Sequence, residues 1–326
     1  MKLQLLIPQY KETEEIIKPL LDSIALQQNV DFSEIGVIIC NDGSDTALSD
    51  AFLNAYPYQI QYIKAEHKGV SAARNRCLDA ARADYVMFCD ADDMFYNACG
   101  LYILFREIAG GGFNAFASVF VEETRHPLTK EPLYINHEMD STFVHGKAYN
   151  REFLLKNNIR WDERLTIHED SYFNILAQKV AGQLTFCPVS FYLWKWRDDS
   201  VCRHDEKYIL KTYNNMLDSS TALVKQLLSR GLSNDARATV CQIIYDAYFT
   251  MNKKEWVDQE NQEYRRNTER RFKRYFDEFR ELYEPMSEQD KAPIIMSVKN
   301  QKFQEGLLME SITFDDWIKQ IEEMDG

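Results

Sequence analysis

The first ninety residues alternate regularly between short apolar runs and longer segments whose apolar side chains have helical spacing. The apolar runs predict buried strands at residues 3–7, 35–40, 60–63 and 85–89. The segments between them predict helices at residues 12–28 and 69–83, and a short helix, capped by Ser44 or Asp45, that ends near Asn54. This alternation predicts a mostly parallel sheet covered by helices, so the fold class is α/β and Rossmann-like.

Polar loops follow three of the predicted strands, at residues 8–11, 41–45 and 90–93. In a parallel sheet the carboxyl ends of the strands meet at one edge, and ligands bind beyond that edge. We therefore expect the three loops to converge on a single binding site.

The rest of the chain changes character after about residue 207. Before it, the pattern predicts strands at 115–121, 141–145 and 185–196 and helices at 149–157 and 169–180. After it, only long helical patterns occur, at residues 208–229, 234–253, 256–283, 287–300 and 313–324. We predict two domains, an α/β domain over residues 1–205 and an all-helical domain over residues 206–326.

Composition and charge exclude several classes of protein. A net charge of −13 argues against a nucleic-acid partner. The seven cysteines show no C-x-x-C pair and several lie in apolar runs, which predicts a reducing compartment and no structural zinc site. Gln4 and Pro8 interrupt the N-terminal apolar run, and no stretch approaches the ~18–20 residues of a membrane span. The expectation is a cytoplasmic protein, with peripheral contact at the inner membrane face left open.

Three carboxylates, Asp90, Asp92 and Asp93, follow the fourth predicted strand within four residues. Carboxylates this close repel one another, and a divalent cation relieves that repulsion. Mg²⁺ sites use one or two carboxylates together with water and substrate phosphates, so the pattern indicates Mg²⁺ or Mn²⁺ holding a diphosphate. The structural alternative is that the aspartates cap the N-terminus of a helix.

Two further segments reach the same predicted edge. The sequence N-D-G-S-D at residues 41–45 is typical of a turn, but beside Asp90 its Asp42 could accept hydrogen bonds from a nucleobase. In the segment 67–75, Gly69 and the small residues after it allow close backbone approach, and Arg74 could face a phosphate or a base.

In this order the motifs resemble the family 2 glycosyltransferases of GT-A fold. The matching segments are Pro8-Gln9-Tyr10, Asn41-Asp42-Gly43-Ser44, the run from Gly69 to Asn75, Asp90-Ala91-Asp92-Asp93, and Glu169-Asp170. Each segment is common alone, and the five together are specific. The resemblance covers residues 1–205 and is silent about the rest of the chain.

The resemblance implies a donor site for a nucleotide-sugar, usually a UDP-sugar. Asp42 would contact the base, Pro8 and Tyr10 would wall it, and Arg74 would lie near the nucleotide. Asp90 would contact ribose or metal. Lys11 departs from the family pattern, which often has Asn, and this leaves the role of that position open.

The resemblance also implies the catalytic groups of an inverting displacement. Asp92, with Asp90, would ligate Mn²⁺ or Mg²⁺, and Asp170 would be the general base that takes a proton from an acceptor hydroxyl. Glu169 would point elsewhere on the same helix, toward the acceptor. The structural alternative for both is a negatively charged helix N-terminus.

The end of the predicted α/β domain carries two further candidates. In related enzymes this region folds over the donor, so Arg197 or Arg203 is expected on the diphosphate. His204 is a candidate third metal ligand, with a surface histidine as the alternative.

The resemblance thus implies a metal-dependent, inverting hexosyl- or N-acetylhexosaminyltransferase of surface polysaccharide or glycoconjugate synthesis. One alternative is a sugar nucleotidyltransferase, which normally needs a Gly-rich basic loop where residues 8–12 stand. Another is a catalytically inactive interaction protein. Acceptors left open are surface glycan, teichoic-acid-like polymer, protein, lipid carrier and modified nucleic acid. The helical domain is expected to govern acceptor choice or form a homo-oligomer.

Overall fold

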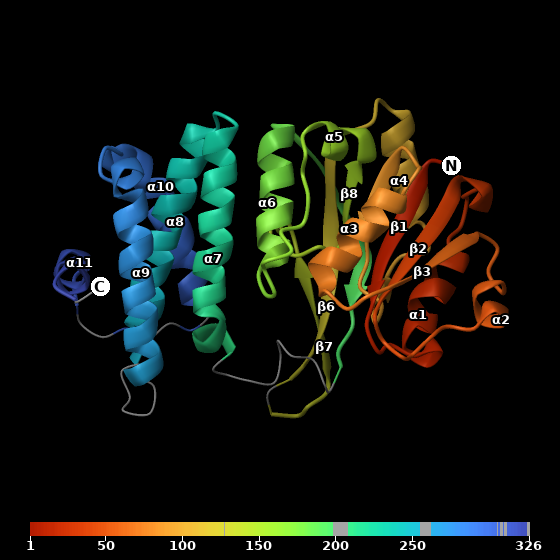
Figure 1. Cartoon of the computed structure of the whole chain (residues 1–326), viewed down its shortest axis with the longest axis horizontal. Helices are drawn as coiled ribbons and strands as arrows, with labels where there is room; N and C mark the ends of the chain where they lie inside the picture. The colour runs from red at the N-terminus through yellow and green to blue at the C-terminus, as the bar shows by residue number, and fades with distance from the viewer. Residues whose placement is uncertain are drawn as a thin grey trace. The chain divides into compact units, whose positions relative to one another are not determined.

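The computed structural model describes residues 1–126, 128–197, 208–254, 262–304 and 312–324, together with residues 306 and 309. The chain separates into two compact units, residues 1–200 and residues 201–326. Within the described residues the strands of the sheet belong to the first unit, and the second is built of helices (Figure 1). An α/β fold followed by a helical region is thus confirmed, while the predicted boundary between residues 205 and 206 lies outside the described residues.

Four parallel strands form the N-terminal half of the sheet in the order β3-β2-β1-β4. They are β1 (Leu3–Gln9), β2 (Ile35–Asp42), β3 (Gln59–Ala65) and β4 (Tyr85–Phe88). β1 runs through Pro8, past its predicted end. The carbonyl of Leu6 faces β4 and accepts a hydrogen bond from the N–H of Cys89, just past the end of β4. Residues two apart in a strand face the same side, so the nitrogen of Pro8 also faces β4, but beyond the end of that strand. Its missing N–H therefore costs no ladder hydrogen bond.

The remaining strands continue the sheet beyond β4 in mixed orientation. β8 (Lys147–Asn150) is antiparallel to β4 and to β6 (Ala115–Arg125), and β9 (Leu184–Trp194) is parallel to β6. The short β5 (Met94–Phe95) pairs with β9, and β7 (Pro132–His137) pairs with β6. Together the described strands make one nine-stranded sheet.

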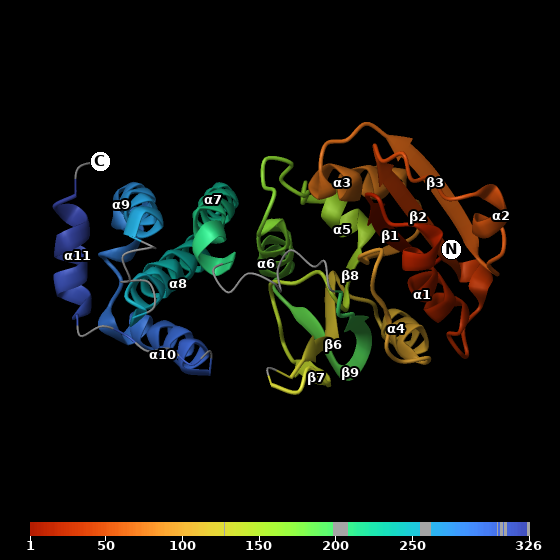
Figure 2. The same cartoon turned by 90° about the horizontal axis from the view of Figure 1, so that it is seen from below.

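Helices cover both faces of this sheet (Figure 2). α1 and α4 lie on one face, where alternate residues of β1 and β2 form the core with them; α3, α5 and α6 lie on the other. The helices of the first unit are α1 (Glu14–Ala25), α2 (Asp50–Leu53), α3 (Val70–Ala80), α4 (Gly100–Ala109), α5 (Arg151–Lys156) and α6 (Glu169–Ala181), with a 3₁₀ turn at Phe32–Glu34. α3 and α6 begin at the edge where β1, β2 and β4 end.

Two local predictions are wrong for reasons of side-chain hydrogen bonding. Residues 141–145 do not form a strand, because the Asp140 carboxylate accepts from the backbone N–H groups of Thr142 and Phe143 and holds a turn. The short helix after β2 is capped by Ser49, whose hydroxyl accepts from the N–H of Phe52. Ser44 instead accepts from a loop N–H two residues on.

The second unit packs its helices around aromatic side chains. Its described helices are α7 (Tyr208–Ser229), α8 (Ser233–Met251), α9 (Gln262–Tyr283), α10 (Glu288–Gln304) and α11 (Phe314–Glu322). The buried rings of Phe272 and Trp317 lie 5.0 Å apart at the contact of α9 with α11. Among the described helices of the whole chain, none combines the length and the apolar character that crossing a membrane requires.

Candidate active site

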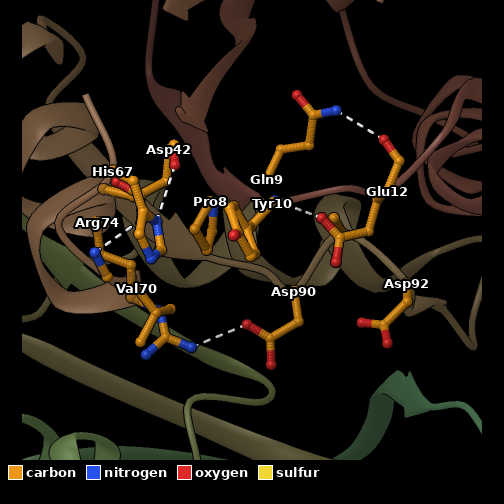
Figure 3. A pocket seen from close by; sticks show the side chains of 13 residues that line it. Pro8, Gln9, Tyr10, Glu12, Asp42, His67, Val70, Arg74, Asp90 and Asp92 are labelled. Carbon is orange, nitrogen blue, oxygen red and sulfur yellow. Dashed lines mark hydrogen bonds and ion pairs between the residues drawn. The ribbon is translucent and has the colours of Figure 1, made fainter. Parts of the chain in front are cut away.

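A cavity of about 340 Å³ lies beyond the carboxyl ends of β1, β2 and β4. It is lined by the loops after these strands and by the first turn of α3, so the predicted convergence of the three loops is confirmed. Figure 3 shows Asp42 on one side of this pocket and Asp92 on the other, with Pro8, Tyr10 and Asp90 between them.

The loop after β1 places Pro8 and Tyr10 in the pocket wall. Gln9 is buried and its side-chain amide donates to the carbonyls of Glu12 and Thr46, which ties this loop to the loop after β2. Lys11 has φ 71°, in the left-handed region that favours Gly and Asn. That conformation is a physical reason why Asn suits this position. The Lys11 ammonium lies over the Tyr10 ring, 4.9 Å from its centroid.

Asp42 is buried at the end of β2, with both carboxylate oxygens hydrogen-bonded. Oδ1 accepts from the N–H of Lys68 at 3.0 Å and from Arg76 at 3.2 Å, and Oδ2 accepts from the N–H of Gly69 at 2.7 Å. His67 places its Nδ1 2.8 Å from Oδ2. These contacts clamp the carboxylate to the loop that starts α3.

The tight approach of that loop requires the glycine after Asp42. Gly43 has φ 76°, and a Cβ there would lie 2.4 Å from the backbone nitrogen of His67. The left-handed conformation and the close contact each disfavour any larger residue.

Arg74, in α3, contacts three carboxylates. Its guanidinium donates to Asp170 at 2.7 Å, to Asp90 at 2.9 Å and to Glu169 at 3.1 Å. The side chain is 3% exposed and stacks 4.3 Å over the ring of Trp161. Arg74 was expected near the nucleotide; it also lines the pocket, and its charge is placed between the carboxylates of two distant segments.

Asp170 lies in the first turn of α6, and the pKa of its carboxyl group is raised. Its second oxygen accepts from the N–H of Val144 at 3.2 Å. Burial raises the pKa of Asp170 to about 7, against the lowering effect of Arg74. A carboxylate with a pKa near neutrality can both accept and release a proton at physiological pH.

The Asp90–Asp93 turn divides its carboxylates between the pocket and the interior. Asp90 and Asp92 line the pocket, and Arg197 donates to Asp92 at 2.9 Å. Asp93 is 1% exposed, accepts from the N–H of Lys195 and lies 3.6 Å from the buried His145. Burial raises the pKa of Asp93 well above its ordinary value and lowers that of His145 to about 4.

The sequence matches one known family over this region. The profile of glycosyl transferase family 2 matches residues 5–175, more than half of the chain. This chain belongs to the family 2 glycosyltransferases. The matched segment contains Asp42, Arg74, Asp90, Asp92 and Asp170.

Similar curated family members come from bacteria. The uncharacterized glycosyltransferase EpsJ of Bacillus subtilis is 28% identical over 60% of this chain and 62% of its own length. The putative glycosyltransferase EpsH of the same organism is 34% identical over 66% of this chain and 67% of its own length. Glycosyltransferase GlyA of Streptococcus pneumoniae is 26% identical over 72% of this chain. The chain spans less than two thirds of EpsJ, and 38% of GlyA.

Solved structures show the same fold. Staphylococcus aureus TarS 1–349 in complex with UDP matches with a TM-score of 0.62 at 16% identity, over 97% of this chain and 95% of that one. A mannosyltransferase from Pyrobaculum calidifontis, in complex with GDP-Man and Mn²⁺, matches with a TM-score of 0.51 at 15% identity over 69% of this chain. The first unit of this family 2 chain therefore has the GT-A fold.

The carboxylates of the pocket fit a divalent cation. Asp90 and Asp92 both line the cavity, and burial together with the neighbouring Asp90 raises the pKa of Asp92, a cost that a bound cation removes. Ligand atoms of Asp90, Asp93 and His145 also lie within 4.8 Å of one another. Because Asp93 and His145 are buried and do not line the cavity, Asp90 and Asp92 are the groups that would hold a cation at a substrate. The predicted diphosphate contact Arg203 and the predicted ligand His204 lie outside the described residues.

Some residues of this site were not predicted from sequence. Glu12 lines the pocket, and Arg76 binds Asp42. Arg76 follows Arg74 by two positions, which is about 200° around a helix, so the two guanidinium groups point to opposite sides of α3. That spacing, with carboxylates expected on both sides, is a signal that could have identified Arg76.

Proposed function

We propose that this chain is an inverting, metal-dependent glycosyltransferase that moves a hexosyl or N-acetylhexosaminyl group from a UDP-sugar to an acceptor hydroxyl. The observation that carries the proposal is Asp170, a half-buried carboxylate with a pKa of about 7, held by Arg74 beside the pocket-lining Asp90. The pocket also contains a clamped carboxylate, Asp42, for a base, and two carboxylates for a cation.

In the proposed reaction Asp170 accepts the proton of the acceptor hydroxyl as the oxygen attacks the anomeric carbon. Oδ1 of Asp170 binds Arg74 and Oδ2 binds the N–H of Val144. Each carboxylate oxygen has two lone pairs, so an acceptor hydroxyl can still donate to it. Arg74 keeps the carboxylate oriented and stabilises its charged form.

We propose that Asp90 and Asp92 act on the leaving diphosphate through a bound cation. A divalent cation held by Asp90 and Asp92 would neutralise charge that builds up on the diphosphate. Arg197 binds Asp92, and we propose that it exchanges this carboxylate for a phosphate oxygen when the donor binds. Glu169 does not point away from Asp170 as expected, because both carboxylates accept from the same nitrogen of Arg74. We propose that the second oxygen of Glu169 faces the acceptor.

The names and complexes of the chain's relatives support the proposed donor and acceptor classes. TarS has been crystallised with UDP and with UDP-GlcNAc, and its name describes a poly(ribitol-phosphate) β-N-acetylglucosaminyltransferase. GgaA and GgaB of Bacillus subtilis are minor teichoic acid biosynthesis proteins. We therefore propose a UDP-sugar donor and a hydroxyl of a surface glycan or glycoconjugate as acceptor.

The second unit is proposed to bind the acceptor or a second copy of the chain. It is compact by itself and has its own aromatic core, as a separately acting module would. A chain that ends at residue 205 should keep UDP binding and lose acceptor transfer or self-association. Full transfer with an unchanged oligomeric state would contradict this role.

The test of the proposed function is Asp170→Asn, which keeps the shape of the side chain and removes its basicity. Transfer from a UDP-sugar should fall about 10²–10⁴-fold, the usual contribution of a general base. UDP affinity, measured by calorimetry with Mn²⁺, should stay within about twofold of wild type. A variant that loses UDP binding, or keeps turnover, would show that Asp170 is not the base.

A further inference from the structure

His67 fills the part of the pocket that the proposed function assigns to the nucleobase. Its ring stacks on Tyr10 with 4.4 Å between ring centroids and 19° between planes. Its Nδ1 lies 2.8 Å from Oδ2 of Asp42 and 3.0 Å from the backbone carbonyl of Asp42. Both neighbours are acceptors, so Nδ1 carries the proton and donates it to Asp42.

The imidazole thus satisfies both requirements that a pyrimidine would satisfy there. It presents a flat aromatic face to Tyr10 and a ring N–H to the Asp42 carboxylate (Figure 3). Two rings in contact at this separation leave no room for a base between them. A base that uses the same face and the same carboxylate must therefore move His67.

His67 is also the contact of Asp42 that is easiest to displace. Of the four groups on this carboxylate, two are backbone N–H groups, and the third, Arg76, is half-buried. The His67 side chain is 56% exposed, so rotation about its side-chain bonds can carry it into solvent. Asp42 then keeps three contacts and regains a free lone pair on Oδ2.

We propose that His67 is an internal stand-in for the nucleobase, which the donor must displace from Tyr10 and Asp42 before it binds. This inference rests on the proposed function, because it assumes a nucleotide at the Asp42 side of the pocket. A protein whose binding-competent state is only partly populated shows an apparent affinity reduced by that fraction. Removing the His67 ring removes this competition and should tighten binding.

The test is calorimetric titration of UDP, in the presence of Mn²⁺, into the full chain as wild type, His67→Ala and His67→Phe. We expect His67→Ala to bind UDP at least about threefold more tightly, because the base no longer has to displace one hydrogen bond and one ring stack. The association rate should rise by a similar factor, because the His67 side chain no longer has to move away before UDP binds. His67→Phe keeps the stack on Tyr10 and loses the N–H, so its affinity should lie between those of the other two proteins.

Two results would overturn the inference in distinguishable ways. UDP binding to His67→Ala that is equal to or weaker than wild type would mean that His67 supports the base or plays no part, while the proposed donor site would stand. A wild-type chain that binds neither UDP nor GDP, or an Asp42→Ala variant that binds UDP as wild type does, would overturn the donor site and this inference together.

Discussion

The two ends of the pocket hold their carboxylates in different ways. At the Asp42 end, formed by Asp42, Tyr10, His67 and Arg76, one carboxylate is bound by backbone N–H groups and by side chains that reach solvent. In the Arg74 cluster, formed by Arg74, Asp90, Glu169 and Asp170, one buried guanidinium is the shared ion-pair partner of three carboxylates.

The difference shows which end can lose a side-chain contact and keep its structure. Backbone donors keep the Asp42 end in shape even when a side chain leaves, which suits a surface that exchanges one flat ring for another. In the Arg74 cluster every charge depends on one side chain, and removal of one partner of a buried ion pair leaves the others uncompensated. Under the proposed function, the first end would bind the donor and the second would hold a fixed catalytic geometry.

The largest effect is expected from Arg74→Ala. Three carboxylates would lose their buried counter-charge, so the free energy of unfolding should fall by about 3–5 kcal/mol and transfer should be lost. The matched variant Arg76→Ala removes a half-buried guanidinium from Asp42 and should cost less than about 1 kcal/mol. Urea unfolding of both variants measures the contrast, and equal losses would mean that the two ends are held alike.

The pH dependence of transfer is the next largest effect. The pKa of Asp170 is raised to about 7, so the fraction of ionised base, and with it kcat, should fall about tenfold per pH unit below pH 7 and level off above it. A flat kcat profile over this range would show that ionisation of Asp170 does not limit transfer.

The smallest effect comes from the glycine that closes the Asp42 end. Gly43→Ala forces a side chain into left-handed backbone and against the backbone nitrogen of His67, so it should cost more than about 1 kcal/mol and weaken UDP binding. Gly182→Ala is the matched control, because φ is 72° there and a Cβ would meet nothing within 4 Å. If thermal unfolding and UDP affinity change equally in both variants, the close approach at Gly43 has no role.

The convergence of Asp42 with the Asp90–Asp93 turn could be predicted from the sequence because it depends on where neighbouring strands end, whereas the contacts of His67 and Arg76 with Asp42 were not predicted. Asp42 ends the buried strand β2, the Asp90–Asp93 turn comes soon after β4, and the carboxyl ends of neighbouring parallel strands meet at one edge. The helices of the second unit were also predicted, since their apolar spacing continues over several turns.

The Arg74 cluster could not be predicted in the same way. Arg74 is 95 and 96 positions from Glu169 and Asp170, and no pattern near Arg74 indicates that its guanidinium reaches α6. The mistaken strand at residues 141–145 has a related cause, because the Asp140 side chain competes with the strand ladder for backbone N–H groups. That turn brings the N–H of Val144 to Asp170, so the mispredicted segment is part of the site.

The most direct test of the account is titration of UDP into wild type and Asp92→Ala, each with and without Mn²⁺. Its central claim is that Asp42 and the Asp90–Asp92 pair belong to one metal-dependent donor site. The account predicts that wild type binds UDP tightly only with Mn²⁺, and that Asp92→Ala loses at least tenfold of that affinity. A UDP affinity that changes neither when Mn²⁺ is left out nor in Asp92→Ala, or no UDP binding under any condition, would contradict it.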